Sequence, residues 1–447
     1  MDLFKRKVYD ELLRWKDTSQ GRSAILVEGA RRVGKSTLVE AFVRNEYRSH
    51  ILIDFSNMDE DLRNVFRNPR DLDRFFLFLQ QMFRTTLYRR ESAIVFDEVQ
   101  LFPPARQMIK HLVADGRYDY IETGSLLSIK QNVRGILIPS EEESIRLHPM
   151  DFEEYLWAIG DEQTIPLIRR CFIDREPLGR TMHERIMAEY RLYMLMGGMP
   201  QAISAYLETN NLSEVEKVKR SILNIYQNDS VKIEYGGGEK AGRILELIPS
   251  YLSNHDKSFS PGEIKQDGRT RDYLKSVGWL KESMIINVCV DNYDPSPALS
   301  LNLDENKFKM YMLDTGLLVT SAMMADSRDA EELYEAMLRG KLQINEGMFF
   351  ENMVSQELVA AGHRLVYTKF TVKDTDNIQE VDFLISDGRR IVPVECKSGN
   401  MSSRHKSLDR LMEKYGRFVD TAYVVHSKDL RVDGSITYIP IYMSMFL

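Results

Sequence analysis

The feature that most constrains this chain is a glycine-containing segment near its N-terminus. It matches G-x-x-x-x-G-K-[ST] in full and reads Gly29-Ala30-Arg31-Arg32-Val33-Gly34-Lys35-Ser36-Thr37. The motif lies between a predicted buried strand at 24–28 and a predicted helix at 35–44, which is the context that it requires. Glycine lets the backbone curl so that successive N–H groups point at phosphate oxygens. A flexible glycine turn is the alternative, and the flanking strand and helix argue against it.

This loop predicts a site for ATP and Mg²⁺. Lys35 should reach the β- and γ-phosphates, and the Ser36 hydroxyl should bind Mg²⁺. The helix N-terminus adds partial positive charge. We expect the whole segment 29–37 to hold the nucleotide.

Two adjacent acids follow about sixty residues later. Asp97 and Glu98 end the apolar segment 93–96. A carboxylate at the end of a buried strand is costly unless a positive charge lies opposite, and Mg²⁺ on Ser36 supplies that charge. We therefore expect Asp97 to bind the metal through water and Glu98 to polarise the attacking water, which indicates hydrolysis. Capping of the next helix is the alternative for this pair.

The first 150 residues alternate short apolar segments with helical patterns. Strands are predicted at 24–28, 50–55, 93–97, 118–123 and 144–148, and helices at 35–44, 72–89 and 105–114. Short strands separated by helices predict an α/β fold with a parallel sheet, and continuous apolar strands fit burial on both faces. From 151 to about 235 the pattern is helical, so we expect a P-loop domain with a helical extension over 1–235.

Gly236-Gly237-Gly238 predicts the next boundary, because three glycines neither hold a helix nor pack a core. Residues 236–330 read as a winged-helix-like segment, with helices near 244–252 and 270–277 and a two-stranded wing at 278–280 and 284–290. Residues 331–447 form the predicted third domain, which begins with a helix near 347–361 and continues mainly as strands.

Two acids and a lysine are expected to meet in this third domain. Asp387-Gly388 between apolar segments predicts a hairpin. With a four-residue loop at 387–390, Ser386 pairs with Ile391, and Asp382 lies opposite Glu395. A two-residue loop shifts the pairing by two residues and keeps both acids on one face, which Lys397 shares.

Two converging carboxylates suit a divalent cation, here Mg²⁺ or Mn²⁺, and a neighbouring lysine can orient water or stabilise phosphate charge. A solvated cross-strand ion pair is the alternative. Pro393 in the second strand predicts an edge or a bulge there.

The motifs resemble those of prokaryotic AAA-type ATPases that carry a C-terminal domain of unknown function. The resemblance rests on segments along nearly the whole chain: 29–36, 97–100, 123–125, 148–155, 197–200, 311–317 and the residues from Glu351 onward. It implies that Thr123 or Ser125 senses the γ-phosphate, and that Arg134 or Arg146 is the arginine finger. The spacing D…E-x-K resembles a restriction-endonuclease-like core, in which Glu351 would be the first-helix acid. The nuclease-like fold could also be present without nuclease activity.

Composition limits the partners. The net charge is −7, so a nucleic-acid partner would need a local basic patch, for which 269–281 is a candidate; a solvated helix face is the alternative. Cys171, Cys289 and Cys396 do not have zinc-site spacing, and their number is odd, which indicates a reducing cytoplasm. We find no signal peptide and no membrane-spanning stretch.

Two functions remain open. The first is Mg²⁺-dependent ATP hydrolysis coupled to nucleic-acid handling, extending to metal-dependent DNA cleavage. The second is a nucleotide-dependent regulatory or signalling switch with a non-catalytic nuclease-like domain. ATP, DNA and further copies of the chain are the candidate partners. A DNA-binding regulator without hydrolysis is disfavoured by Glu98.

Overall fold

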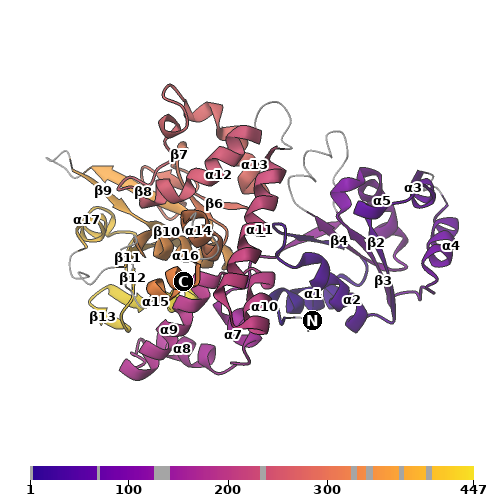
Figure 1. The fold of residues 1–447 in the computed structure, drawn as a ribbon, viewed down its shortest axis with the longest axis horizontal. Helices are drawn as coiled ribbons and strands as arrows, with labels where there is room; N and C mark the ends of the chain where they lie inside the picture. The colour runs from indigo at the N-terminus through magenta and orange to yellow at the C-terminus, as the bar shows by residue number, and fades with distance from the viewer. Residues whose placement is uncertain are drawn as a thin grey trace. The chain divides into compact units, whose positions relative to one another are not determined.

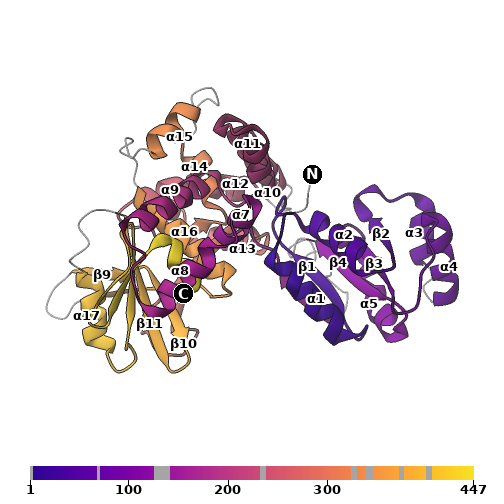
Figure 2. The same cartoon turned by 90° about the horizontal axis from the view of Figure 1, so that it is seen from below.

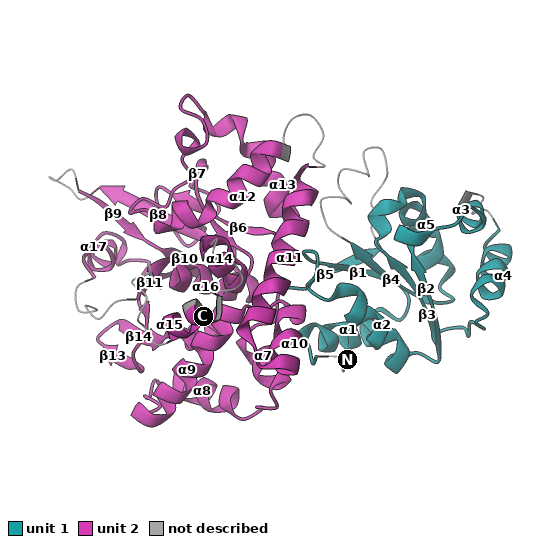
Figure 3. Ribbon diagram, in the orientation of Figure 1, with its two compact units in different colours: residues 1–148 teal, residues 149–447 magenta. Residues whose placement is uncertain are grey.

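The computed structural model describes residues 4–67, 71–124, 141–231, 238–323, 330–338, 346–371, 377–398 and 405–447. The chain divides into two compact units, 1–148 and 149–447 (Figure 3). This division differs from the expected boundaries at 235/236 and 330/331. The first of these falls at residues 232–237, outside the described residues, and the second falls at the start of helix α15 (Ala330–Leu338).

The first unit contains the predicted parallel sheet. Its described strands run in the order β2-β3-β4-β1-β5, and every neighbouring pair is parallel. The bounds are β1 (Ala24–Glu28), β2 (Ser49–Asp54), β3 (Ser92–Asp97), β4 (Asp119–Gly124) and β5 (Glu142–Arg146). Strands β1, β3 and β4 are buried along their whole length, which the apolar sequences of β1 and β3 predicted, whereas β4 also buries Asp119, Glu122 and Thr123.

Helices cover this sheet (Figure 1). They are α1 (Lys7–Ser19), α2 (Lys35–Glu46), α3 (Glu60–Arg67), α4 (Leu72–Phe83) and α5 (Pro103–Asp115), with short 3-10 turns η1 (Phe55–Asn57) and η2 (Val99–Leu101). Alternate strand residues such as Leu26, Ile94 and Phe96 share one apolar core with side chains of α3, α4 and α5. Helix α4 ends six residues before the predicted end at 89, because Arg84 adopts a left-handed conformation with φ of 50°.

The second unit begins with helices, as the sequence predicted for the segment after 151. These are α7 (Phe152–Ala158), α8 (Thr164–Asp174), α9 (Arg180–Met196), α10 (Pro200–Thr209) and α11 (Leu212–Val231). Asp151 starts α7 with a reciprocal cap in which Glu154 also takes part. Within this unit α10 and α11 pack together, and α11 also contacts α12 (Gly238–Ser253).

The segment expected to form a winged helix has a different arrangement. It contains α12, η3 (Pro261–Glu263), η4 (Thr270–Asp272) and α13 (Leu274–Glu282), followed by the antiparallel strands β6 (Ile286–Asn292) and β7 (Leu303–Met312). The expected wing strand at 278–280 is wrong, because these residues lie in α13. Strand β6 also pairs with β8 (Val366–Thr371), which pairs with β9 (Ile378–Val381). The resulting sheet, β7-β6-β8-β9, joins this segment to the C-terminal part.

A second sheet lies near the C-terminus in the order β10-β11-β12-β14-β13. Its strands are β10 (Phe383–Asp387), β11 (Arg390–Lys397), β12 (Ala422–His426), β13 (Arg431–Asp433) and β14 (Ile436–Pro440). Ser386 pairs with Ile391 as predicted, although Asp387 and Arg390 also pair, so the loop is shorter than four residues. At Pro393, β11 pairs with β10 alone, since its pairing with β12 begins at Val394.

Helices complete this part of the unit: α14 (Thr315–Met323), α16 (Glu346–Ala360), α17 (Lys406–Tyr415) and the 3-10 segment η5 (Ile441–Phe446). Helix α16 contacts β11 and α17 contacts β9, which can be followed in Figure 2. Within the described part of the chain, no helix combines the length and apolar composition needed to cross a bilayer.

Candidate functional site

The phosphate-binding loop is curled by residues with positive φ. Arg32 has φ of 69° and Gly34 has φ of 95°, directly before α2 begins at Lys35. Gly29 has no room for a side chain, because a Cβ atom there would lie 2.5 Å from the backbone oxygen of Leu147. The loop thus has the strand–loop–helix context expected from its sequence, with the N-terminus of α2 at its end.

Lys35 is folded against this loop. Its side chain is buried, and Nζ donates to the carbonyl oxygens of Gly29 and Ala30, both at 3.0 Å. Burial lowers the pKa of Lys35, and the charges of Glu98 and Asp97 oppose that shift. The ammonium group therefore lies at the position along the loop where the sequence placed the phosphate contact.

Asp97 and Ser36, the two predicted Mg²⁺ ligands, are in contact. Ser36 Oγ donates to Asp97 Oδ1 at 2.8 Å, although 61 residues separate them. The Thr123 hydroxyl donates to the same carboxylate oxygen and accepts from the backbone N–H of Glu98 at 3.1 Å. The carboxyl ends of β1, β3 and β4 therefore assemble one polar cluster.

Glu98 adopts a left-handed backbone conformation, with φ of 53° and ψ of 45°. Such a conformation costs a non-glycine residue about 1–2 kcal/mol and is found where surrounding structure imposes it. The carboxylate is partly exposed and accepts from the Gln100 side chain, a contact that the sequence did not suggest. Glu98 is therefore held in one orientation beside Asp97.

The remaining candidates of this site are Ser125, Arg134 and Arg146. Ser125 and Arg134 lie outside the described residues. Arg146 is mostly exposed, and its Nε lies 3.9 Å from Glu28 Oε2 at the end of β1. The choice between the two sensors and between the two arginine fingers stays open.

The C-terminal acids also meet, on elements of the second unit. Glu351 on α16 and Asp382 between β9 and β10 both lie near the ammonium group of Lys309, at 3.2 Å and 3.7 Å. Asp382 accepts from the backbone N–H of Cys396 at 2.8 Å. Glu395 pairs with Lys397, with 2.6 Å between Oε1 and Nζ.

Sequence reasoning missed two lysines and one acid of this cluster, namely Lys257, Lys309 and Glu380. Lys309 on β7 is fully buried and also bonds Glu380, while Lys257 bonds Glu351. The available signal was a lone lysine within the apolar strand segment 308–312, since a buried lysine needs acidic partners. Acids and lysines therefore neutralise each other inside the protein.

The pKa values of the carboxyl groups in this cluster are shifted in opposite directions. Burial alone would raise the pKa of Glu351, but Lys309 and Lys257 outweigh burial and lower it to about 2. Burial raises the pKa of Asp382 to about 6, with a further contribution from Glu351. Burial and the neighbouring Asp382 raise the pKa of Glu395 to about 8.

These contacts decide which acids fit a divalent cation. Glu395 Oε2 is buried and has no hydrogen-bond partner among the described residues. The pKa values of Asp382 and Glu395 are raised, and a bound cation would lower them by favouring the ionised carboxylates. Both oxygens of Glu351 are already bonded, to Lys309 and Tyr311 and to Lys257. Among the described residues, there is no group of three or more His, Cys, Asp or Glu side chains that could hold a metal ion. Two carboxylates at most fit the cation.

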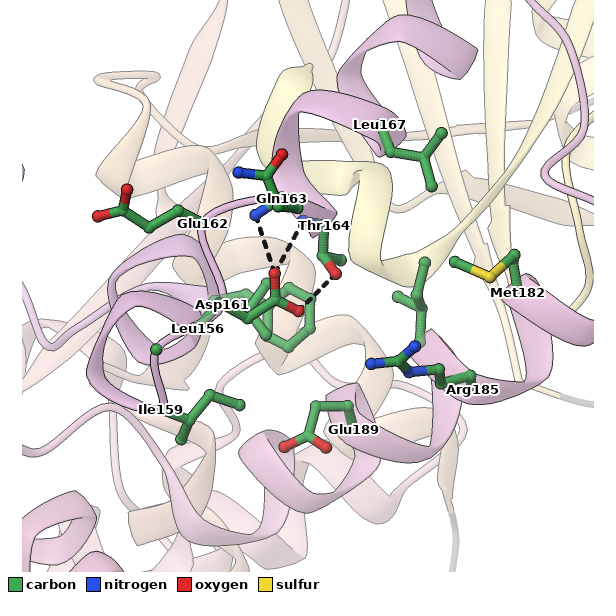
Figure 4. A pocket seen from close by; sticks show the side chains of 13 residues that line it. Leu156, Ile159, Asp161, Glu162, Gln163, Thr164, Leu167, Met182, Arg185 and Glu189 are labelled. Carbon is green, nitrogen blue, oxygen red and sulfur yellow. Dashed lines mark hydrogen bonds between the residues drawn. The ribbon is translucent and has the colours of Figure 1, made fainter.

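A cavity of about 550 Å³ lies elsewhere in the second unit, among α7, α8 and α9. Figure 4 shows Asp161 inside it, bonded to the backbone N–H groups of Gln163 and Thr164 and to the Thr164 hydroxyl. These contacts order the turn before α8, whose N-cap residue is Gln163, and Glu189 accepts from the Tyr155 hydroxyl. None of the predicted site residues lines this cavity.

Three family models match successive parts of the chain. Residues 21–156 match an AAA domain, residues 187–328 match a domain of unknown function (DUF8612), and residues 346–443 match another domain of unknown function (DUF4143). The predicted AAA-type P-loop ATPase domain is thereby confirmed for the N-terminal part. None of these three models describes a restriction-endonuclease-like core or a winged helix.

Solved structures with similarity to the chain include the following three. A signal transduction ATPase with numerous domains (STAND) from Pyrococcus horikoshii, with a tetratricopeptide repeat sensor, is 12% identical at a TM-score of 0.29; the match covers 80% of this chain and 49% of that protein. Drosophila ORC bound to DNA is 14% identical at 0.27, covering 68% and 90%. Cdc6p from Pyrobaculum aerophilum is 12% identical at 0.26, covering 76% and 97%. This chain thus spans about half the length of the STAND protein, and none of the curated proteins matches it.

Proposed function

We propose that this protein binds ATP with Mg²⁺ and hydrolyses it at the site formed by Lys35, Ser36, Asp97 and Glu98. The observation that carries the proposal is the 2.8 Å hydrogen bond between Ser36 and Asp97, since it joins the two halves of the predicted Mg²⁺ site across 61 residues. The match of residues 21–156 to an AAA domain supports it.

The residues present fit a nucleotide and its metal. Bound Mg²⁺ would neutralise charge that develops on the phosphates, and Ser36 and Asp97 are the residues that would hold it. Lys35 exchanges its two carbonyl partners for phosphate oxygens, and the loop N–H groups bind the phosphate chain. Glu98 accepts a hydrogen bond from water and orients it, and Thr123 acts as the γ-phosphate sensor through its hydroxyl.

The test is ATP turnover by the full chain with Mg²⁺, alone and with single- or double-stranded DNA. We expect turnover that EDTA abolishes and that DNA increases if the ATPase handles nucleic acid. Asp97→Asn is the matched variant, because it keeps the size of the side chain and removes its charge. Equal turnover by this variant and the wild type would contradict the proposed metal site.

For the C-terminal part we propose that Asp382 and Glu395 share one divalent cation beside Lys397, in a restriction-endonuclease-like domain. The free Oε2 atom of Glu395 and the raised pKa values of both acids support this site. Glu351 is better described as the partner of Lys309 and Lys257 than as a metal ligand.

The second candidate function is a nucleotide-dependent switch with a non-catalytic C-terminal part, which acts in the cytoplasm through assembly of copies of the chain. It is favoured by Lys309, since its ammonium group already forms ion pairs with Glu351, Glu380 and Asp382. A Mn²⁺- or Mg²⁺-dependent DNA cleavage assay separates the two functions. Cleavage supports the first, and its absence at every metal concentration supports the switch.

A further inference from the structure

A buried arginine before α1 contacts the phosphate-binding loop. Arg6 is 6% exposed; its Nη1 donates to the carbonyl of Val33 at 3.0 Å and its Nη2 to the carbonyl of His148 at 2.6 Å. Val33 belongs to the loop, and His148 is the last residue of the first unit. One guanidinium group therefore bonds two backbone segments that lie far apart in the sequence.

The donor of these hydrogen bonds is a charged group inside the protein. A guanidinium group is always protonated and has only donors, so its burial requires acceptors with good geometry. Backbone carbonyls supply these acceptors here, and hydrogen bonds from a charged donor are stronger than neutral ones. Arg6 therefore fixes the direction of the Val33 carbonyl.

The loop and the segment after β5 also touch each other directly. The backbone N–H of Leu147 donates to the carbonyl of Glu28 at 2.7 Å, and the missing Cβ of Gly29 leaves space that the Leu147 carbonyl fills. Val33 is fully buried, so its peptide has little freedom to move by itself. A shift of the loop backbone would consequently displace residues 147 and 148.

We propose that Arg6 is a positioning residue of the ATP site. It holds the Val33 carbonyl away from the phosphates, so that the loop presents N–H groups, and it links the nucleotide state of the loop to the backbone at His148. This is where the chain leaves the first unit, so the bond pair offers a route by which ATP binding reaches the second unit. The inference rests on the proposed ATP site.

The test uses the full chain with Arg6→Ala, Arg6→Lys and the control Arg14→Ala, an exposed arginine on α1 that donates to the carbonyl of Asp10 within its own helix. Nucleotide affinity is measured with a fluorescent ATP analogue. We expect Arg6→Ala to weaken binding about 10- to 100-fold, the range that loss of a charge-assisted hydrogen bond gives. Arg6→Lys should restore part of the affinity, since lysine can donate to one carbonyl, and Arg14→Ala should bind as the wild type does.

Hydrogen exchange separates positioning from simple stabilisation. In the wild type, saturating Mg²⁺-ATP should slow amide exchange at residues 147, 148 and 150, and in Arg6→Ala it should not, even when the site is saturated. Affinity within twofold of the wild type, or an unchanged exchange response in both Arg6 variants, would overturn the inference. Failure of the wild type itself to bind ATP would instead refute the proposed ATP site, and the inference with it. If Arg6→Ala does not fold, Arg6→Lys carries the same comparison.

Discussion

Replacement of Lys35 by methionine tests the ATP site most directly. Lys35 is buried, and its ammonium group contacts only uncharged loop carbonyls at hydrogen-bond distance. Methionine keeps most of the side-chain volume and removes the charge. Loss of one preorganised donor to developing charge typically lowers turnover by about 10²–10³, or about 3–4 kcal/mol of transition-state stabilisation. We expect Lys35→Met to lose ATP hydrolysis by at least that factor.

Stability provides the control within the same experiment. Burial lowers the pKa of Lys35, so the folded protein disfavours the ammonium group, and methionine removes this penalty together with two hydrogen bonds. The two effects oppose each other, and we expect the free energy of unfolding to change by no more than about 1 kcal/mol. Turnover is measured at saturating ATP and unfolding in urea, with Lys110→Met, an exposed lysine on α5, as the matched variant. Turnover by Lys35→Met within tenfold of the wild type would refute the assignment.

The other predictions concern the remaining acids. Glu98→Gln should bind ATP with wild-type affinity in equilibrium dialysis but hydrolyse it at least 100-fold more slowly, since an amide cannot activate water; joint loss of binding and hydrolysis would contradict this role. Asp382→Ala should abolish any Mn²⁺- or Mg²⁺-dependent DNA cleavage by the wild type, and residual cleavage would remove Asp382 from the site. The pKa of Glu395 is raised from its usual 4.5 to about 8, so the folded state retains a proton that the unfolded state has lost, and stability falls as pH rises through that window. Urea titrations at pH 5 and pH 9 measure the loss of unfolding free energy between these two pH values. Glu395→Gln should reduce that loss by at most about 5 kcal/mol, and an unchanged loss would show that another group causes it.

The contacts of the proposed ATP site could be predicted from sequence because its parts are local. The motif at 29–36 fixes a strand, a loop and a helix within about twenty residues, and a parallel sheet brings the carboxyl ends of its strands to one edge. Asp97 ends such a strand and Thr123 lies one residue before the end of another, so their contact follows from topology without knowledge of side-chain packing. The left-handed conformation of Glu98 and its hydrogen bond to Gln100 depend on packing around the turn. No sequence pattern predicts that packing.

The C-terminal cluster was predicted in part for the same reason. A hairpin fixes register over a few residues, so Ser386 and Ile391 pair as expected, and Asp382 and Glu395 lie next to the paired Phe383 and Val394. Glu351 was expected to act with them, but its partners come from elsewhere in the chain. Lys257 and Lys309 lie 94 and 42 residues before it, at separations that sequence periodicity does not relate.

The sheet β7-β6-β8-β9 explains how these distant lysines reach the acids. Because β6 pairs with β8, strands β6 and β7 belong to one sheet with β8 and β9, and β7 carries Lys309 to the side of Glu380 and Asp382. The wing expected at 284–290 is thus a strand of the same sheet as β8 and β9. Removal of residues 236–330 would leave Glu351 buried without Lys257 and Lys309, and an unpaired buried charge costs several kcal/mol. The acidic cluster therefore depends on the segment before it, and any cation bound by Asp382 and Glu395 lies beside an ammonium group that this segment supplies.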